Sequence, residues 1–259
     1  MNRLNPERPV FVTGVQRSGT TLIGRILAEH PAAAMTINGK LPYLFFHWVP
    51  EDAAECSVQH LRADEIVHAL RRKPILGVPG DFIDSAVAPR IFEWAQRGAA
   101  GSFRTRQQLL ASIREVCVEI YRLVNPRASI WGDKYNEYLL WLDRLRELYP
   151  RARIVMITRT ASDSAESMLR AFRGRPWCPP TVDLALAKHS DWTREWQRVK
   201  NTMEPGAGFE ISYEDLLDDP VAVLQGLARF LDIEPEPLER LANMVRRPLT
   251  RALAATPNG

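Results

Sequence analysis

Three short apolar stretches have the pattern of buried strands. They are "VFVT" (residues 10–13), "RIVMIT" (residues 153–158) and "FEISY" (residues 209–213). The first two are continuous apolar runs with β-branched residues, which is typical of central strands in a parallel sheet covered on both faces. The sequence therefore predicts a sheet built from segments that lie far apart along the chain.

Helical patterns lie between these strands. In "RTRQQLLASIREVCVEIYRLV" (residues 104–124), apolar residues recur at three- and four-residue steps and mark one buried face. "YNEYLLWLDRLRELYP" (residues 135–150) has the same pattern, and its helix is expected to stop at Pro150. Strands that alternate with helices indicate an α/β fold with a mainly parallel sheet flanked by helices.

Two polar signals predict helix starts. Asp163, with Glu166 three residues later, has the spacing of a capping box, which predicts a helix that continues through Phe172. Asp219 followed by Pro220 is typical of an N-cap with a first-turn proline, and it precedes the apolar "VAVLQGLARFL".

The chain shows no internal repeat and no obvious linker, so we expect one domain over residues 1–259. The proline-rich "RPWCPPT" (residues 175–181) is expected to be a loop between helices of that domain. In parallel α/β sheets, ligands bind beyond the carboxyl ends of the strands, so the segments that follow the strands are the first place to look for a site.

Composition indicates a globular protein with a small anionic ligand. Hydrophobic residues make up 46% of the chain, charged residues make up 25%, and the net charge of +3 is too weak to indicate nucleic-acid binding. The most apolar stretch, "LPYLFFHWV" (residues 41–49), is about half the length that a membrane span needs, and "MNRLNPERP" lacks a signal-peptide core. We expect a cytoplasmic protein.

The three cysteines, Cys56, Cys117 and Cys178, are widely spaced and lack any metal-ligand spacing. Buried thiols in a reducing compartment are the expected state.

The segment "GVQRSGTT" follows the first strand and has the frame of a phosphate-binding loop. Gly14 and Gly19 have the P-loop spacing, but Thr20 stands where that motif has its lysine. A glycine-bearing turn that leads into a helix directs backbone N–H groups and the helix dipole at an anion. Arg17 can bond two oxygens of that anion, and the hydroxyls of Ser18, Thr20 and Thr21 can add donors.

The segment "RTASDSAES" follows the second predicted strand and offers a second anion site. Arg159 leaves the strand end, at the place where a magnesium-triphosphate enzyme has a metal-binding aspartate, and Ser167 follows eight residues later. Arg170 lies one turn beyond Ser167. Because the carboxyl ends of parallel strands share one edge of a sheet, we expect the two segments to be neighbours and to hold two phosphates without a metal.

Four blocks of the sequence resemble, in order, the sulfotransferases that use 3′-phosphoadenosine-5′-phosphosulfate (PAPS). "GVQRSGTT" resembles their 5′-phosphosulfate loop, and "RTASDSAES" resembles their 3′-phosphate segment. "WGDKYNEYLLWLDRLRELYPRARIVMITR" resembles the lysine, helix, proline and strand that lead into the second segment. "ISYEDLLDDPVAVLQGLARFLDI" resembles the strand and helix near the family's C-terminus. The blocks cover almost the whole chain and imply a P-loop-like nucleotide-binding core.

The resemblance implies a role for each matching residue. Those that would hold the 5′-phosphosulfate are Arg17, Ser18, Gly19, Thr20 and Thr21. Arg159 and Ser167 would hold the 3′-phosphate, and Tyr213 would contact the nucleotide. Lys134 matches the lysine near the bridging oxygen of the leaving group, so Arg17 and Lys134 would be the electrophilic pair in catalysis.

The chain departs from the family where the catalytic base is expected. One branch has a histidine two positions after the lysine, and this chain has Asn136. Other branches have a glutamate near a "GE" dipeptide, and this chain has Lys40. His47 is the predicted substitute, because a neutral imidazole can accept a proton, and Asp81 is the next candidate. For the family's C-terminal nucleotide loop, the candidate stand-ins are Arg246, Arg247 and Arg251.

The predicted reaction is O-sulfation of a small-molecule, lipid or glycan hydroxyl, with helices in residues 61–124 expected to roof the acceptor pocket. Two alternatives stay open at this point. A P-loop kinase or NTPase would need a lysine at position 20 and a magnesium-binding acid. A non-catalytic relative would bind the nucleotide and transfer nothing. The sequence leaves the oligomeric state open, with a homodimer as one option.

Overall fold

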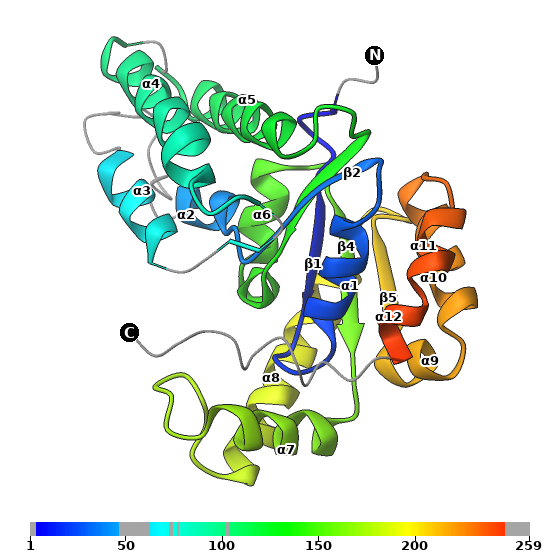
Figure 1. The fold of residues 1–259 in the computed structure, drawn as a ribbon. Coiled ribbons are helices and arrows are strands. Elements are labelled where there is room, and N and C mark those ends of the chain that lie inside the picture. Colours follow the sequence, from blue (N-terminus) through cyan, green and yellow to red (C-terminus); the bar gives the residue numbers. More distant parts are fainter. Residues whose placement is uncertain (1–3, 47–62, 73–74, 77, 102–103, 247–259) are drawn as a thin grey trace.

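The computed structural model describes residues 4–46, 63–72, 75–76, 78–101 and 104–246 (Figure 1). Within these residues, five parallel strands form one sheet in the order β2-β3-β1-β4-β5. The strands are β1 (Val10–Gly14), β2 (Ala33–Ile37), β3 (Ile130–Lys134), β4 (Arg153–Thr158) and β5 (Gly208–Ser212). The predicted α/β fold and parallel sheet are confirmed.

The three predicted strands are β1, β4 and β5, and the sequence reading missed β2 and β3. Strand β3 has the sequence "IWGDK", yet all of its residues are buried. Its glycine is required by close packing, because a Cβ on Gly132 would lie 1.8 Å from the carbonyl oxygen of Val10. Polar residues buried for the site therefore interrupted the apolar pattern that marks a central strand.

The helices lie in the connections and after the last strand. The first part of the chain contributes α1 (Thr20–Ala28), α2 (Leu41–Phe46), α3 (Ala63–Arg71), α4 (Ala88–Ala99) and α5 (Arg106–Val124). The second part contributes α6 (Leu142–Leu148), α7 (Ala161–Phe172), α8 (Val182–Lys200), α9 (Tyr213–Asp218), α10 (Pro220–Leu231), α11 (Glu236–Leu241) and α12 (Asn243–Arg246). A π-helix, η2 (Ile83–Val87), precedes α4, and a 3₁₀-helix, η3 (Asn136–Trp141), precedes α6.

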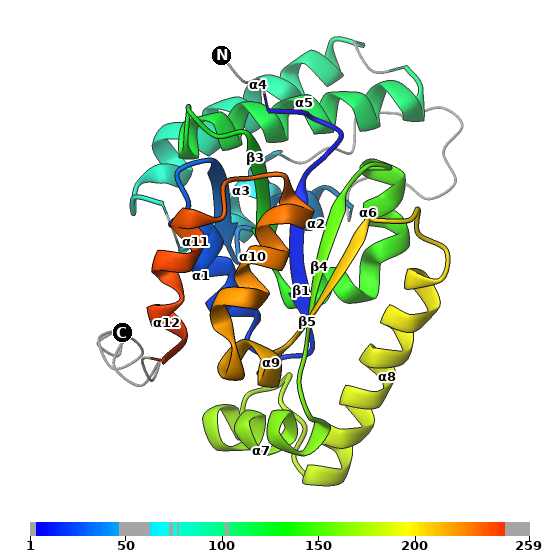
Figure 2. The same ribbon diagram turned by 90° about the vertical axis from the view of Figure 1, so that its right-hand side faces the viewer.

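Helices cover both faces of the sheet, as the apolar strands require. Phe11 and Ile154 lie on one face, in a core with residues of α2, α4, α5 and α6. Val12 and Val155 lie on the other face, in a core with residues of α1, α10 and α11. Figures 1 and 2 show the two helical layers, with α7 beyond the end of the sheet at which β4 terminates.

Of the two predicted helix starts, one is confirmed and one is wrong. Asp219 caps α10 by accepting a hydrogen bond from the backbone N–H of Ala222. The helix over residues 104–124 also forms, as α5. By contrast, α7 begins at Ala161, so Asp163 lies in its first turn and is not the cap. The N-cap of α7 is Thr160, whose hydroxyl bonds to a glutamate described below instead of capping the helix.

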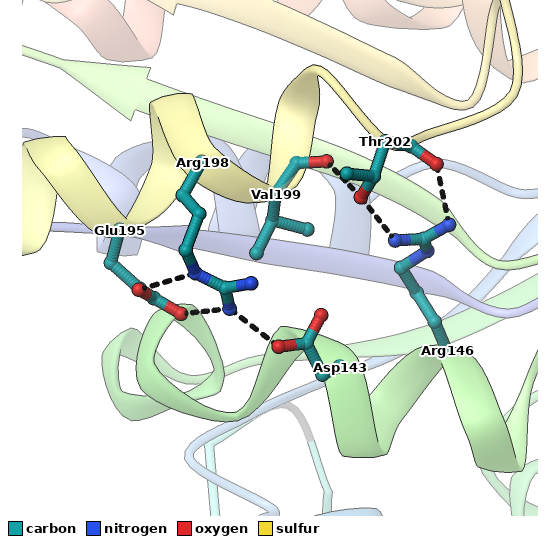
Figure 3. A network of polar contacts seen from close by, with 6 residues as sticks. All are labelled: Asp143, Arg146, Glu195, Arg198, Val199 and Thr202. Carbon is teal, nitrogen blue, oxygen red and sulfur yellow. Dashed lines mark hydrogen bonds and ion pairs between the residues drawn. The ribbon is translucent and has the colours of Figure 1, made fainter.

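The segment of residues 135–150 forms helix, but its first part is the 3₁₀-helix η3 and only the rest is α6. The predicted loop of residues 175–181 connects α7 to α8. Polar contacts fasten the end of α8 to α6: Arg146 donates hydrogen bonds to the hydroxyl and carbonyl oxygens of Thr202, and Arg198 bonds Asp143 (Figure 3). The opposite end of α8 lies beside α7, near the site.

None of the helices in the described ranges combines the length and the apolar character that a bilayer-spanning segment needs. Cys117 and Cys178 are buried free thiols, as predicted, and Cys56 lies outside the described residues.

Candidate functional site

The register of the sheet brings four strand ends to one edge. Gly14 of β1 pairs with Ile157 of β4, and Val12 pairs with Lys134, the last residue of β3. Thr158 pairs with Ser212 at the end of β5. The segments that follow these strands are therefore brought together, although up to 200 residues separate them in sequence.

A cavity of about 310 Å³ opens among these segments. It is lined by Gln16, Arg17, Gly19, Thr20, Thr21, Leu22, Asn38, Lys40, Lys134, Tyr135, Asn136, Glu137, Arg159, Phe172, Trp177 and Tyr213. Most of the predicted site residues are in this set. Ser18 and Ser167 are not, and each instead makes a hydrogen bond beside the cavity.

The shape of the turn after β1 is set by its own backbone. Arg17 has φ 74° and Gly19 has φ 98°, so two residues of the turn have left-handed backbone. The buried Ser18 hydroxyl donates to the carbonyl oxygen of Val15 at 2.7 Å and closes the turn. Gly19 is the N-cap of α1 and supplies no side-chain oxygen, so no side chain caps the first N–H groups of the helix.

The two predicted anion segments are in direct contact, as expected. Arg159 Nη1 donates to the carbonyl oxygen of Arg17 at 3.0 Å. In return, Arg17 Nε donates to Ser167 Oγ at 3.0 Å. The Arg159 guanidinium also lies 4.7 Å from the centre of the Tyr213 ring, and the Arg17 guanidinium lies 5.4 Å from the Phe172 ring. Burial lowers the pKa of Arg17, and the nearby Arg159 charge lowers it further.

Lys134 is buried at the cavity, with 3% of its surface exposed. Burial lowers the pKa of its amine to about 8, against the opposing charge of Asp133. Its Nζ donates to Asn136 Oδ1 at 2.7 Å. The amide of Asn136 donates in turn to the carbonyl oxygen of Gly14 at 2.7 Å and to Thr20 Oγ1 at 3.1 Å. Asn136 thus ties the lysine to the phosphate-binding turn.

Asp133 is a buried carboxylate that fixes the turn after β2. It accepts hydrogen bonds from Thr36 Oγ1 and Tyr138 Oη and from the backbone N–H groups of Gly39 and Lys40, at 2.7 to 3.0 Å. Burial raises the pKa of this carboxyl, although the four hydrogen bonds oppose the shift. Asn38 and Lys40 of the turn that it holds line the cavity.

The family model described as "Sulfotransferase family" matches residues 9–237, which include every strand of the sheet and both anion segments. The chain belongs to the sulfotransferase family. This confirms the resemblance drawn from the four sequence blocks.

Several known proteins are similar to this sulfotransferase. A Caenorhabditis briggsae protein named "Putative protein-tyrosine sulfotransferase" is 25% identical over 232 residues, which are 89% of this chain and 67% of that protein. The sulfotransferase domain of the Synechococcus PCC 7002 olefin synthase is similar in structure, with TM-score 0.58, 18% identity and coverage of 97% of this chain and 92% of that one. Sulfotransferase STF9 from Mycobacterium avium aligns with TM-score 0.55 and 16% identity over 93% of this chain and 68% of that one. At these identities the two solved structures show a shared fold.

Hydrogen bonds that the sequence did not reveal position Arg159 in this sulfotransferase. The backbone N–H and the hydroxyl of Thr160 both donate to Glu214 Oε1, at 3.0 and 2.6 Å. Burial raises the pKa of Glu214, but the hydrogen bonds from Thr160 and from Ser212 outweigh it and lower the pKa to about 2. His189 Nε2 donates to the carbonyl oxygen of Arg159 at 3.1 Å. The carbonyl of Arg159 is therefore fixed to α8, and Thr160, the next residue, is fixed to α9.

The structure describes one of the two predicted bases and not the other. His47 lies outside the described residues, so its role stays a prediction. Asp81 is exposed just before η2 and is not among the described residues that line the cavity, so its role as a base stays a prediction. Lys40 does line the cavity, with Nζ 5.2 Å from the centre of the Tyr135 ring. Glu137 also lines the cavity and was missed, because no family pattern marks it.

Other predictions stay untested. Arg246 ends α12, and Arg247 and Arg251 lie outside the described residues. The described residues of 63–124 contribute nothing to the cavity lining, so their role as an acceptor roof stays a prediction. Across the described ranges, no cluster of three or more His, Cys, Asp or Glu side chains could hold a metal ion.

Proposed function

We propose that this sulfotransferase moves the sulfuryl group of PAPS to a hydroxyl acceptor. The observation that supports the proposal best is the pair of hydrogen bonds that join the two anion segments, from Arg159 to the Arg17 carbonyl and from Arg17 to Ser167. Two cationic anion-binding segments side by side suit a nucleotide with phosphates at both its 3′ and 5′ positions.

The residues present fit this donor. Arg17, Thr20, Thr21 and the first N–H groups of α1 would hold the 5′-phosphosulfate. Arg159 and Ser167 would hold the 3′-phosphate, and the buried Arg159 Nε has no hydrogen-bond partner among the described residues. Tyr213, whose ring lies between Gly19 and the Arg159 guanidinium, would contact the nucleotide.

The transfer step follows from these charges. The acceptor oxygen bonds to sulfur as the bond between sulfur and the phosphate oxygen breaks, so negative charge develops on the leaving 3′-phosphoadenosine 5′-phosphate (PAP). Lys134 and Arg17 would stabilise that charge, and the rigid turn would hold the donor in line with the acceptor. Lys134 is suited to this task because Asn136 already ties its amine to the turn after β1.

The acceptor is proposed to be a hydroxyl on a small molecule, lipid or glycan. Phe172 and Trp177 give part of the cavity lining an aromatic surface, while Lys40 and Glu137 give polar contacts. The name of the C. briggsae relative adds a phenolic hydroxyl to the acceptors worth testing.

The kinase alternative is not supported, because the residue at the P-loop lysine position is Thr20, and its side chain bonds Asn136. The cytoplasmic location and the homodimer stay predictions.

Calorimetric titration with PAP and with 5′-AMP tests the donor assignment. PAP should bind more tightly than 5′-AMP, because its 3′-phosphate adds charge-assisted hydrogen bonds at Arg159 and Ser167, each worth about 1.5–3 kcal/mol. Arg159→Ala should remove most of this preference. Arg194→Ala, which changes an exposed arginine of α8 paired with Asp191, is the matched control and should leave the preference intact. Equal affinity of the unmodified protein for the two nucleotides would contradict the assignment.

A further inference from the structure

Transfer to a hydroxyl releases a proton, and the donor-binding groups are poorly suited to accept it. Arg17 and Arg159 are cations, and guanidinium groups do not lose their proton in proteins. The Asn136 side chain is an amide, and its hydrogen bonds are used to hold Lys134, Gly14 and Thr20. A base must therefore come from another part of the cavity lining.

The described part of the lining offers one good candidate. Among the described residues that line the cavity, Glu137 contributes the sole carboxylate, and none is a histidine. It follows Lys134 by three residues, at the start of η3, and its side chain is half-buried. The candidate base and the proposed electrophile are therefore supplied by one short segment that leaves the sheet at β3.

Tyr135 orients this carboxylate. Its hydroxyl donates to Glu137 Oε2 at 2.6 Å, while the described residues give no hydrogen bond to Oε1. Burial raises the pKa of Tyr135, and so does the hydrogen bond to Glu137, so the phenol remains a neutral donor. One carboxylate oxygen is thus fixed by the protein, and the other can receive a proton from a bound acceptor.

Lys134 is the rival base, because its amine has a lowered pKa of about 8. Its geometry opposes that role, since Nζ is a donor to Asn136 Oδ1. Binding of an anionic nucleotide beside it would also favour the ammonium form. The amine is therefore better used as a donor to the leaving group.

Building on the proposed function, we propose that Glu137 is the general base for the acceptor hydroxyl and that Tyr135 positions it. As the acceptor oxygen forms its bond to sulfur, the Glu137 carboxylate takes the hydroxyl proton. The bond between sulfur and the phosphate oxygen breaks with its electron pair on PAP. The protonated Glu137 then returns its proton to solvent.

The test compares Glu137→Gln, which keeps the shape but cannot take the proton, with the unmodified protein. PAP formation from PAPS is measured with two phenols, tyramine and 4-nitrophenol, at a mildly alkaline pH at which 4-nitrophenol is largely ionised and tyramine's phenol is not. Water serves as the third acceptor, because PAP released from PAPS alone measures it. Tyr135→Phe and Glu115→Gln are made in parallel, and the latter removes an exposed carboxylate of α5 as the matched control.

Glu137→Gln should lower kcat with tyramine and with water on the order of 10²–10⁴-fold, the usual contribution of a general base. It should lower kcat much less with 4-nitrophenol, which arrives without its proton. Tyr135→Phe should show the same acceptor dependence with a smaller loss, and Glu115→Gln should match the unmodified protein. A merely structural role would reduce all acceptors alike.

Two contrary results have different meanings. If the unmodified protein turns over PAPS while Glu137→Gln is fully active, or equally impaired with every acceptor, Glu137 is not the base and the proposed function still holds. If the unmodified protein releases no PAP from PAPS with any of the three acceptors, the proposed function fails and this inference fails with it. PAP titration of each variant should give unchanged affinity, because Glu137 lies outside the two anion segments.

Discussion

At the scale of single residues, the carboxyl edge of the sheet gathers several positive charges. Arg17 and Arg159 lie side by side, and the pKa of Arg17 is lowered by burial and further by the Arg159 charge. Lys134 is buried beside them with a lowered pKa of about 8. Such an arrangement raises the free energy of the protein alone and is relieved by a bound anion, which is why it indicates a binding site and not a structural core.

Lys134→Ala tests the catalytic part of this charge. If the amine stabilises the leaving phosphate, its loss should lower kcat on the order of 10²–10³-fold, the usual cost of removing one well-placed transition-state donor. Steady-state PAP release from PAPS measures the effect. The thermal unfolding curve of the same variant serves as the folding control, and near-normal turnover would exclude the role.

The same lysine predicts a pH dependence. Because burial lowers its pKa to about 8, the ammonium form that serves catalysis is present below that pH and is lost as the pH rises through it. We therefore expect kcat/KM for PAPS to fall above about pH 8. Lys134→Arg should carry its charge to higher pH, so any activity it retains should lack this falling limb. A limb at the same pH in both proteins would assign it to another group.

At the scale of secondary-structure elements, the turn between β1 and α1 depends on a residue without a side chain. A Cβ on Gly19 would lie 2.5 Å from a ring carbon of Tyr213, and its φ of 98° is strained for any other residue. Gly19→Ala should therefore displace Tyr213 from the Arg159 guanidinium. We expect lower thermal stability together with a loss of PAP affinity, measured by calorimetry.

Gly206→Ala is the matched control for that variant. Gly206 also has left-handed backbone, with φ 79°, but a Cβ there meets nothing within 4 Å. It should lose stability through backbone strain and keep its PAP affinity. An equal loss of affinity in both variants would mean that the contact with Tyr213 is unimportant.

The continuous apolar run of β1 could be predicted from sequence, whereas β3, which has polar residues of its own at the site, could not. Val10 to Val12 in β1 are apolar and lie in the middle of the sheet, so pattern and burial agree. In β3, the polar Asp133 and Lys134 are buried because they serve the turn after β2 and the cavity. The capping box predicted at Asp163 does not form. Thr160 occupies the N-cap position of α7, and its hydroxyl donates to Glu214 instead of capping the helix.

The site residues also divide into those that motifs could predict and those that they could not. Motif spacing placed Arg17 and Arg159 at two strand ends, and the parallel register then brought them together. Glu137 belongs to no recognised motif. Glu214 lies in the block near the C-terminus in which the family resemblance gives a role to Tyr213 alone. The role of Glu214 depends on Thr160, which comes from another element, and a pattern along one element does not record that contact.

At the scale of the whole molecule, the proposed chemistry needs no metal ion. In a P-loop NTPase, magnesium neutralises the phosphates. Here four basic side chains line the cavity at or just after the ends of β1, β2, β3 and β4, namely Arg17, Lys40, Lys134 and Arg159. Sulfuryl transfer from PAPS should therefore be undiminished by excess EDTA, measured as PAP release with and without the chelator. Loss of activity that added magnesium restores would contradict this expectation and favour a metal-dependent mechanism.

The hydrogen bond between Arg159 and the Arg17 carbonyl spans 142 positions of the chain, and Tyr213, the first residue of α9 after β5, lies against the Arg159 guanidinium. No amino-terminal fragment that stops before β5 contains every residue of the proposed nucleotide pocket. During synthesis, the nascent polypeptide would gain its affinity for PAP only after roughly four-fifths of the protein has left the ribosome, as the positions of Arg17 and Tyr213 in the 259 residues imply. Measuring PAP binding by stalled nascent chains of increasing length would therefore show at which chain length β5 docks onto the sheet.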